Sequence, residues 1–167
     1  MQIDKTIDID TVRSLLETVM DPEVPVLSVN DLGIVREIRA NGNELEVIIT
    51  PTYSGCPAMD MIRTNIRMEL LANGFENVKV SQVLSPAWTT DWISEEGKRK
   101  LKEYGIAPPN PKQQVCHTDL FIGDEAVQCP HCNSYHTHRI SEFGSTACKA
   151  LYQCDDCKEP FDYFKCH

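Results

Sequence analysis

Residues 129–132 read Cys-Pro-His-Cys and residues 154–157 read Cys-Asp-Asp-Cys, two Cys-x-x-Cys motifs with 21 residues between them. Each motif brings two thiolates to one metal ion at about 2.3 Å, and two motifs complete a tetrahedron. One such motif also fits redox chemistry, but two at this spacing are typical of a structural metal site. The sequence therefore predicts a tetrathiolate zinc site, with rubredoxin-type iron as the alternative, and its ligands are Cys129, Cys132, Cys154 and Cys157.

The residues around these motifs predict a zinc-ribbon-like module over 128–167, with short strands at 135–140 and 150–153. Because this part of the chain has few large aliphatic side chains, we expect metal binding to supply much of its folding free energy. Cys116-His117 and Cys166-His167 offer ligands for a second site, although nothing in their spacing requires one. The simpler interpretation is that the cysteines outside the two motifs are free thiols.

Cysteine density and a proline cluster divide the chain. Of eight cysteines, only Cys56 lies in residues 1–107, and Pro108-Pro109-Asn110-Pro111 follows directly. We therefore expect an α/β domain at 1–107, a proline-rich linker at 108–127 and the metal module at 128–167.

Charge and hydropathy argue against several classes of partner. The net charge is −9 and the pI about 5.0, whereas binding to a nucleic-acid backbone or an anionic membrane needs a basic surface. The apolar runs, such as 24–27 and 47–49, are too short to span a bilayer. Clustered thiols without a secretory signal are typical of a reducing compartment. We expect a cytoplasmic protein that binds neither nucleic acid nor membrane, and a homo-oligomer is compatible with the sequence.

The first domain is expected to have the order α-β-β-α-β, so that the fold class is α+β with a zinc-ribbon-like module after it. Asp21-Pro22 ends a first amphipathic helix, Asn41-Gly42 is a strong hairpin signal, and Pro57 suits the first position of a second helix. The elements expected in chain order are a helix over 9–20, strands over 34–40 and 44–50, a helix from Pro57 to Asn73 and a strand over 78–84.

Both tryptophans of the chain, Trp88 and Trp92, follow the last of these strands, and a short charged helix is expected over 94–104. The simpler interpretation is that the two rings cover an open face of the small sheet. The alternative is an aromatic wall beside a binding site or a docking point for a partner.

Cys56 is the candidate reactive group of the first domain. It precedes Pro57 and so lies at or just before a helix N-terminus, where free N–H groups and the helix dipole are expected to lower a thiol pKa. The hydroxyls of Thr50 and Thr52 are candidates to reach the same place. The alternative is a small buried cysteine at a strand–helix corner. Residues 1–107 contain no histidine, which argues against Cys–His catalysis within the domain.

Asp21-Pro22-Glu23 places two carboxylates around a rigid turn ahead of the hairpin. They are candidates for a general base or for oxygen ligands to iron. The alternative is that both are turn residues without a chemical role.

Three motifs give the first domain a resemblance. Asp21-Pro22-Glu23-Val24-Pro25, the stretch 29–35 and Thr50-Pro51-Thr52 ahead of Cys56-Pro57 resemble the SufT-type family of iron–sulfur assembly factors over residues 8–95. The resemblance implies a small α/β fold and handling of iron or a cluster. The functional positions of that family fall on Asp21, Glu23, Thr50, Thr52 and Cys56.

A second resemblance covers the whole chain. The stretches 143–152 and 159–167, together with both domains in this order, are similar to the family of small phenylacetate-degradation proteins that accompany the multicomponent phenylacetyl-CoA epoxidase. The resemblance implies a place in aerobic phenylacetate catabolism beside a di-iron oxygenase and a reductase that carries flavin and a 2Fe–2S cluster. Three functions are compatible with it. The favoured one, from the thiol at a helix N-terminus and the first resemblance, is a maturation factor that delivers iron or a cluster to reductase or oxygenase. The second is a stable non-catalytic subunit, and the third, for which the sequence offers no second catalytic group, is an enzyme that uses Cys56 as a nucleophile.

Overall fold

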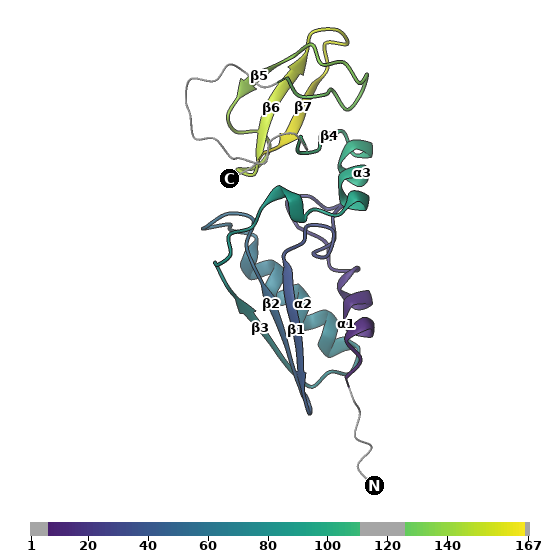
Figure 1. Ribbon diagram of the computed structural model, residues 1–167, viewed down its shortest axis with the longest axis vertical. Coiled ribbons are helices and arrows are strands. Elements are labelled where there is room, and N and C mark those ends of the chain that lie inside the picture. Colours follow the sequence, from purple (N-terminus) through teal and green to yellow (C-terminus); the bar gives the residue numbers. More distant parts are fainter. Residues whose placement is uncertain (1–6, 111–125, 166–167) are drawn as a thin grey trace. The chain divides into compact units, whose positions relative to one another are not determined.

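The computed structural model describes residues 7–110 and 126–165, and the chain divides into two compact units, residues 1–88 and 89–167 (Figure 1). This division falls earlier than the limit expected at residue 107, because β4 (Ile106–Ala107) pairs with β7 (Pro160–Phe164) of the second unit. Most of the linker expected at 108–127 lies outside the described residues. The three predicted domain ranges therefore stay predictions.

The first unit has the predicted order α-β-β-α-β. Its elements are α1 (Ile9–Leu16), β1 (Val35–Asn41), β2 (Glu44–Ile49), α2 (Met59–Ala72) and β3 (Asn77–Gln82). The strands form one sheet in the order β1-β2-β3. β1 and β2 form an antiparallel hairpin around Gly42, whose φ of +57° favours glycine. β2 and β3 are parallel, so α2 is the crossover between them (Figure 1).

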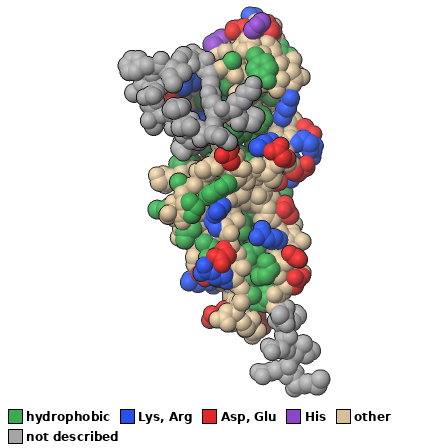
Figure 2. All heavy atoms as spheres, viewed as in Figure 1, with side chains coloured by type: hydrophobic (Ala, Val, Ile, Leu, Met, Phe, Trp, Pro, Cys, Tyr) green, Lys and Arg blue, Asp and Glu red, His purple; other side chains and the backbone are tan. Residues whose placement is uncertain are grey.

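The two faces of this sheet differ. On one face the side chains of Leu45, Val47 and Ile49 are at most 1% exposed and form the core. On the other face Glu46 accepts from Lys79 on β3 at 2.9 Å and lies 3.9 Å from Arg39 on β1, so charged groups cross all three strands. Figure 2 likewise shows acidic and basic side chains standing next to one another. Alternation along β2 thus gives one fully buried face and a second face that is solvated at Glu44 and Glu46 and buried at Ile48, which is 7% exposed.

The helices begin and end at places set by local hydrogen bonds. α1 starts after Asp8, whose side chain accepts from the backbone N–H of Thr11 at 3.2 Å. It ends at Leu16 rather than at the expected residue 20, because the chain then turns to form a bridge between Met20 and Ser28. α2 ends in a Schellman motif, in which the Phe75 N–H donates to the Leu70 carbonyl.

The stretch 28–33 is a turn closed by reciprocal hydrogen bonds. The Asp31 carboxylate accepts from the Ser28 N–H at 3.1 Å, and the Ser28 hydroxyl accepts from the Asp31 N–H at 3.0 Å. Gly33 follows with a φ of +67°. The side chains of Ser28 and Asp31 therefore have a structural role, because their hydrogen bonds hold the backbone of this turn.

Trp88 has a structural role. Its ring is 4% exposed, and its Nε1–H donates to the Leu32 carbonyl at 2.8 Å. The Ser85–Pro86 bond just before it is cis. Burial and the hydrogen bond to Leu32 give the Trp88 ring a structural place, whereas covering of the sheet face stays a prediction.

The second unit begins with a 3-10 turn, η1 (Thr90–Trp92), and α3 (Glu95–Glu103), and continues with β4, β5 (Thr137–Ser141), β6 (Lys149–Cys154) and β7. Its sheet has the order β4-β7-β6-β5. β5, β6 and β7 are antiparallel neighbours, whereas β4 runs parallel to β7. The pattern of a helix and a small sheet with two cysteine turns confirms the predicted α+β class with a zinc-ribbon-like region. In the described parts of the chain, none of the helices has the length and hydropathy needed to cross a membrane.

Candidate metal centres

The two Cys-x-x-Cys motifs form turns with matching hydrogen bonds. In the first, the Asn133 N–H donates to the Cys129 carbonyl at 2.9 Å; in the second, the Lys158 N–H donates to the Cys154 carbonyl at 3.0 Å. Asn133 and Lys158 both have a positive φ, of 64° and 66°. The same backbone conformation is therefore built twice, once on each side of the site.

Glutamines add a second matching pair of contacts. Gln128 and Gln153 each precede the first cysteine of a motif, and their side-chain amides donate to the carbonyls of Asn133 at 3.2 Å and Lys158 at 3.1 Å. Sequence reasoning missed this pairing, although the signal was present as Gln-Cys-x-x-Cys in both motifs. Each turn is thus braced by its own side chain as well as by its backbone.

The four sulfurs lie at the separations that one tetrahedral metal ion requires. Cys129 and Cys157 Sγ are 3.7 Å apart, Cys132 and Cys154 Sγ are 3.5 Å apart, and all four lie within 4.8 Å of one another. Four sulfurs about 2.3 Å from a central ion stand about 3.8 Å from each other. The cysteines therefore fit a tetrathiolate metal site, and they are the only group of three or more clustered His, Cys, Asp or Glu ligands among the described residues.

The pKa shifts differ among the thiols of this cluster: desolvation and hydrogen bonds with neighbouring cysteines raise the pKa of Cys132 and Cys157, whereas the pKa of Cys154 is lowered. The N–H groups of Cys157 and Asp156 donate to the Cys154 sulfur and lower the pKa of that thiol to about 7. Metal binding requires deprotonated sulfur, so these donors favour the ligand form. The ligand set suits zinc and iron alike.

None of the other cysteines and histidines in the described ranges joins this cluster. Cys116, His117, Cys166 and His167, which the sequence offered for a second site, lie outside those ranges. Cys148 is buried, and its sulfur lies 3.0 Å from the Thr146 hydroxyl.

Cys56 lies in the turn that leads into α2. The helix begins at Met59, two residues later than Pro57, and the Met59 N–H donates to the Cys56 carbonyl at 3.3 Å. Gly55, just before, has a φ of +86°, which lets the chain reverse there. The half-buried thiol accepts from the Ala58 backbone N–H and from the Tyr53 hydroxyl. Tyr53 is a neighbour that the sequence analysis did not name.

The pKa of the Cys56 thiol is raised, in contrast to the lowering expected at a helix N-terminus. Burial is the largest cause, and the negative charges of Glu23 and Asp21 add to it. The Ala58 N–H and the Tyr53 hydroxyl act in the opposite direction and are outweighed. The structure thus brings Cys56 into electrostatic contact with both carboxylates of the Asp-Pro-Glu motif.

Asp21 also shapes its own turn. Its buried Oδ1 accepts from the N–H groups of Glu23 at 2.7 Å and Val24 at 2.8 Å, an arrangement that closes the turn over Pro22. Glu23 is half-buried on the same turn. The two carboxylates therefore differ in role. The Asp21 carboxylate holds the backbone of the turn, and that backbone positions Glu23.

The two threonines are placed differently. Thr50 is 1% exposed, and its Oγ1 has no hydrogen-bond partner among the described residues. Thr52 is half-buried. Within that same part of the chain neither hydroxyl hydrogen-bonds to the Cys56 thiol, so their roles stay predictions.

Comparison with known proteins separates the same two regions. The profile of an iron–sulfur cluster assembly protein matches residues 9–82, and that of the PaaD zinc beta ribbon domain matches residues 113–165. A crystal structure of a domain of unknown function, DUF59, from Bacillus anthracis is 27% identical and covers 55% of this chain and 89% of its own, with a TM-score of 0.53. A conserved hypothetical protein from Thermotoga maritima is 29% identical and covers 60% and 98%, with a TM-score of 0.51.

Two curated proteins are similar in sequence. An Fe-S protein maturation auxiliary factor of Porphyromonas gingivalis is 37% identical over 94 residues, 55% of this chain and 88% of its own length. A protein of Escherichia coli K12 that is named as one of the subunits of 1,2-phenylacetyl-CoA epoxidase is 52% identical over 153 residues. That alignment covers 92% of this chain and 90% of the Escherichia coli protein, in agreement with the ribbon match. The chain therefore belongs to the PaaD family.

Proposed function

We propose that this chain is an accessory protein of a phenylacetyl-CoA epoxidase in aerobic phenylacetate catabolism. In this proposal it takes up iron or an iron–sulfur cluster at Cys56 and delivers it to the reductase or the di-iron oxygenase component. Membership of the PaaD family supports the pathway, and the match of residues 9–82 to iron–sulfur assembly proteins supports the handling of metal.

The surroundings of Cys56 are the observation that carries the proposal. A thiolate there stands in the field of Glu23 and Asp21, and like charges raise one another's energy in a half-buried place. A bound cation removes this repulsion, because thiolate and carboxylate are both ligands for it. Burial and, to a lesser extent, the two carboxylate charges raise the pKa of the Cys56 thiol, so little thiolate is present at neutral pH, which disfavours the third function, a Cys56-dependent enzyme.

The small number of protein ligands suits a cargo that leaves again. Cys56 supplies one sulfur and Glu23 one carboxylate, whereas Asp21 already uses Oδ1 for its turn. Release is a ligand exchange, in which side-chain ligands of the receiving protein replace the Cys56 thiolate and the Glu23 carboxylate, and no electron is transferred. The four-cysteine ribbon, held by zinc, would then serve as the surface that selects the receiving protein.

The test measures iron and acid-labile sulfide in the epoxidase reductase, and iron in the oxygenase. Both components are purified from cells with the chain, without it, or with C56A. We expect metal loading of one component to fall without the chain and not to return with C56A. The matched control is C148A, because Cys148 is a buried thiol of the second unit outside the four-cysteine site, and it should restore loading. Full loading with C56A would contradict the proposal.

The name of the Escherichia coli relative favours a second candidate, a stable non-catalytic subunit of the epoxidase. A subunit elutes with the assembled complex in fixed stoichiometry, and its removal abolishes epoxidation while reductase and oxygenase remain fully loaded. A maturation factor is absent from the active complex and is no longer needed once both components are loaded. Reconstitution from purified components with and without this chain therefore separates the two candidates.

A further inference from the structure

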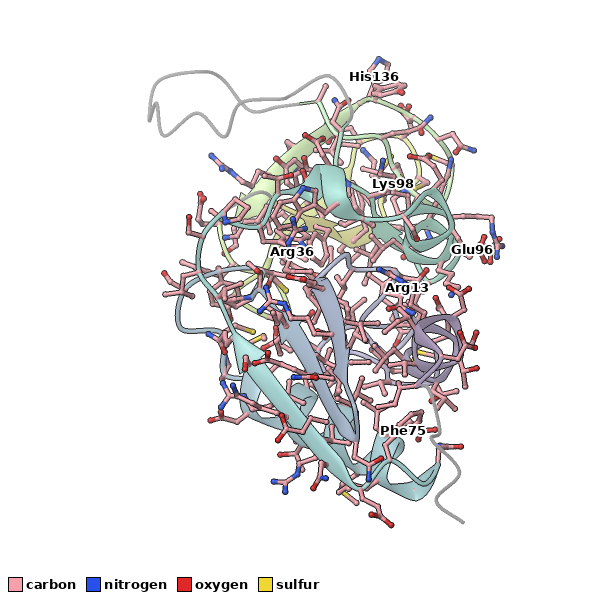
Figure 3. All side chains as sticks on the ribbon, turned by 60° about the horizontal axis from the view of Figure 1, so that its bottom comes forward. Arg13, Arg36, Phe75, Glu96, Lys98 and His136 are labelled. Atoms are coloured by element: carbon pink, nitrogen blue, oxygen red, sulfur yellow. The ribbon has the colours of Figure 1, made fainter. Side chains whose placement is uncertain are left out.

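A pair of histidines lies at the surface of the second unit, outside the four-cysteine site. His138 belongs to β5, and His136 comes directly before that strand. Because successive side chains of an extended chain point to opposite sides, these two share one side. Thr137 between them turns inward and donates to the Val127 carbonyl at 2.6 Å. In Figure 3 the ring of His136 projects away from the ribbon, and Figure 2 shows histidines at the surface next to acidic groups.

Each histidine is held by its own carboxylate through the same ring atom. His138 Nδ1 lies 3.0 Å from Asp155 Oδ1, and His136 Nδ1 lies 3.2 Å from Asp156 Oδ2. Asp155 and Asp156 are the middle residues of the second Cys-x-x-Cys turn, and the Asp155 N–H donates to the His136 carbonyl at 2.7 Å. The turn thus fixes the backbone from which both carboxylates extend, and the Ser134 hydroxyl also donates to the Asp156 carboxylate.

In both histidines Nδ1 is the ring nitrogen next to a carboxylate, so Nε2 is the other ring nitrogen to consider as a metal ligand. When Nδ1–H of an imidazole donates to a carboxylate, the neutral ring keeps its lone pair on Nε2. Histidines that bind metals are oriented in this way, by a carboxylate on the other ring nitrogen that also raises the basicity of the ligand. Two aspartates add negative charge beside the place where a cation would bind.

We propose that His136 and His138 bind one divalent first-row transition-metal ion through their Nε2 atoms, with water as the other ligands. Imidazole is a ligand for Zn²⁺, Ni²⁺, Cu²⁺ and Fe²⁺. The His136 side chain is 78% exposed and that of His138 47%, so the site is open and its ion exchanges with solution. The site is separate from the four sulfurs and does not depend on the proposed role of Cys56.

The test counts two metals in one sample. The full chain, without a polyhistidine tag and with zinc at its cysteines, is dialysed against micromolar Ni²⁺, and zinc and nickel are measured by mass spectrometry. We expect one nickel per chain beside one retained zinc. H136Q and H138Q should each weaken nickel binding at least tenfold, and D155N or D156N by about ten- to one-hundredfold, the usual effect of losing such a partner.

His131 provides the matched control, because it is an exposed histidine of the first Cys-x-x-Cys turn. H131Q should bind nickel as the wild type does, and retained zinc shows that each variant is folded. In the wild type, paramagnetic broadening should reach the ring protons of His136 and His138 first. The proposal is overturned if nickel fails to bind, if it replaces zinc one for one, or if H131Q weakens binding as much as H136Q.

Discussion

The two cysteine regions of this chain differ in how many sulfurs they bring together, and not in one uniform direction of pKa shift, because the thiols of Cys132 and Cys157 in the four-cysteine site also have a raised pKa. Around the four-cysteine site, two matching turns place all four sulfurs within 4.8 Å, and backbone N–H groups lower the pKa of Cys154 to about 7. Around Cys56 a single thiol is half-buried beside two carboxylates, and its pKa is raised. The four sulfurs of the first region fit one tetrahedral metal ion, whereas in the proposed function the single thiol of the second region holds a metal only until it is delivered.

The largest effect is expected from removing the metal of the second unit. In C154A, or after a strong chelator, the four-sulfur site is lost, and with it a metal contribution of about 10–16 kcal/mol in comparable zinc modules. Amide exchange should show loss of protection in β6 and β7, whereas β2 of the first unit stays protected. C148A is the control and should keep both units protected. Unchanged protection of β6 after complete metal removal would show that the ribbon folds without metal.

Asp21 and Glu23 should differ in their effect on stability. D21A leaves the N–H groups of Glu23 and Val24 without their acceptor, so we expect a loss of about 1.5–3 kcal/mol in the free energy of unfolding. E23A should lower the free energy of unfolding by less, because the Asp21 carboxylate still closes the turn in that variant. The main effect of E23A should be on the pKa of the Cys56 thiol. Urea unfolding of both variants checks this. Equal losses would mean that Glu23 also holds the fold.

The glutamine braces test whether the two cysteine turns are equivalent. Q128A and Q153A each remove one amide hydrogen bond to a carbonyl, so each should cost about 0.5–1.5 kcal/mol. Thermal unfolding of the zinc-loaded chain measures both losses. Losses of stability of similar size in Q128A and Q153A would support equivalent turns. A large loss in only one variant would show that one turn contributes more to the stability of the metal site than the other.

The smallest effect concerns the charge around Cys56. A raised pKa lowers the thiolate fraction at neutral pH, so E23Q, which removes a negative charge, should lower the pKa and speed alkylation severalfold. Y53F removes a donor that stabilises the thiolate, so it should raise the pKa and slow alkylation. Peptide mass spectrometry at several pH values, on zinc-loaded chain, measures the rate at Cys56 alone. E44Q, an exposed acid at the start of β2, is the control and should leave the rate unchanged.

Periodic and paired signals in the sequence predicted the fold well. Asn41-Gly42 and the apolar alternation of β2 predicted the hairpin, and the two Cys-x-x-Cys motifs predicted the cluster, because these signals act between near neighbours. The pairing of β4 with β7 was not predicted, since two residues carry no periodicity and their partner stands more than fifty positions away.

The candidate site was predicted less completely than the fold. The resemblance pointed to Cys56, Glu23 and Asp21, which the structure brings into electrostatic contact. The direction of the Cys56 pKa shift was predicted wrongly, because burial and neighbouring charge depend on residues that only the folded chain brings together. Tyr53 was missed for the same reason. For Thr50 and Thr52 the structure shows no hydrogen bond to Cys56 among the described residues.

In the proposed function the four-cysteine site retains its metal, whereas Cys56 exchanges the metal that it binds. The most direct measurement loads the zinc-bound chain anaerobically with ferrous iron and sulfide, then adds a moderate chelator and follows iron and zinc separately over time. We predict that iron leaves the wild type while zinc stays, and that C56A binds no iron but keeps its zinc. Iron bound equally by C56A, or iron found in place of zinc at the four cysteines, would show that Cys56 is not the exchanging site.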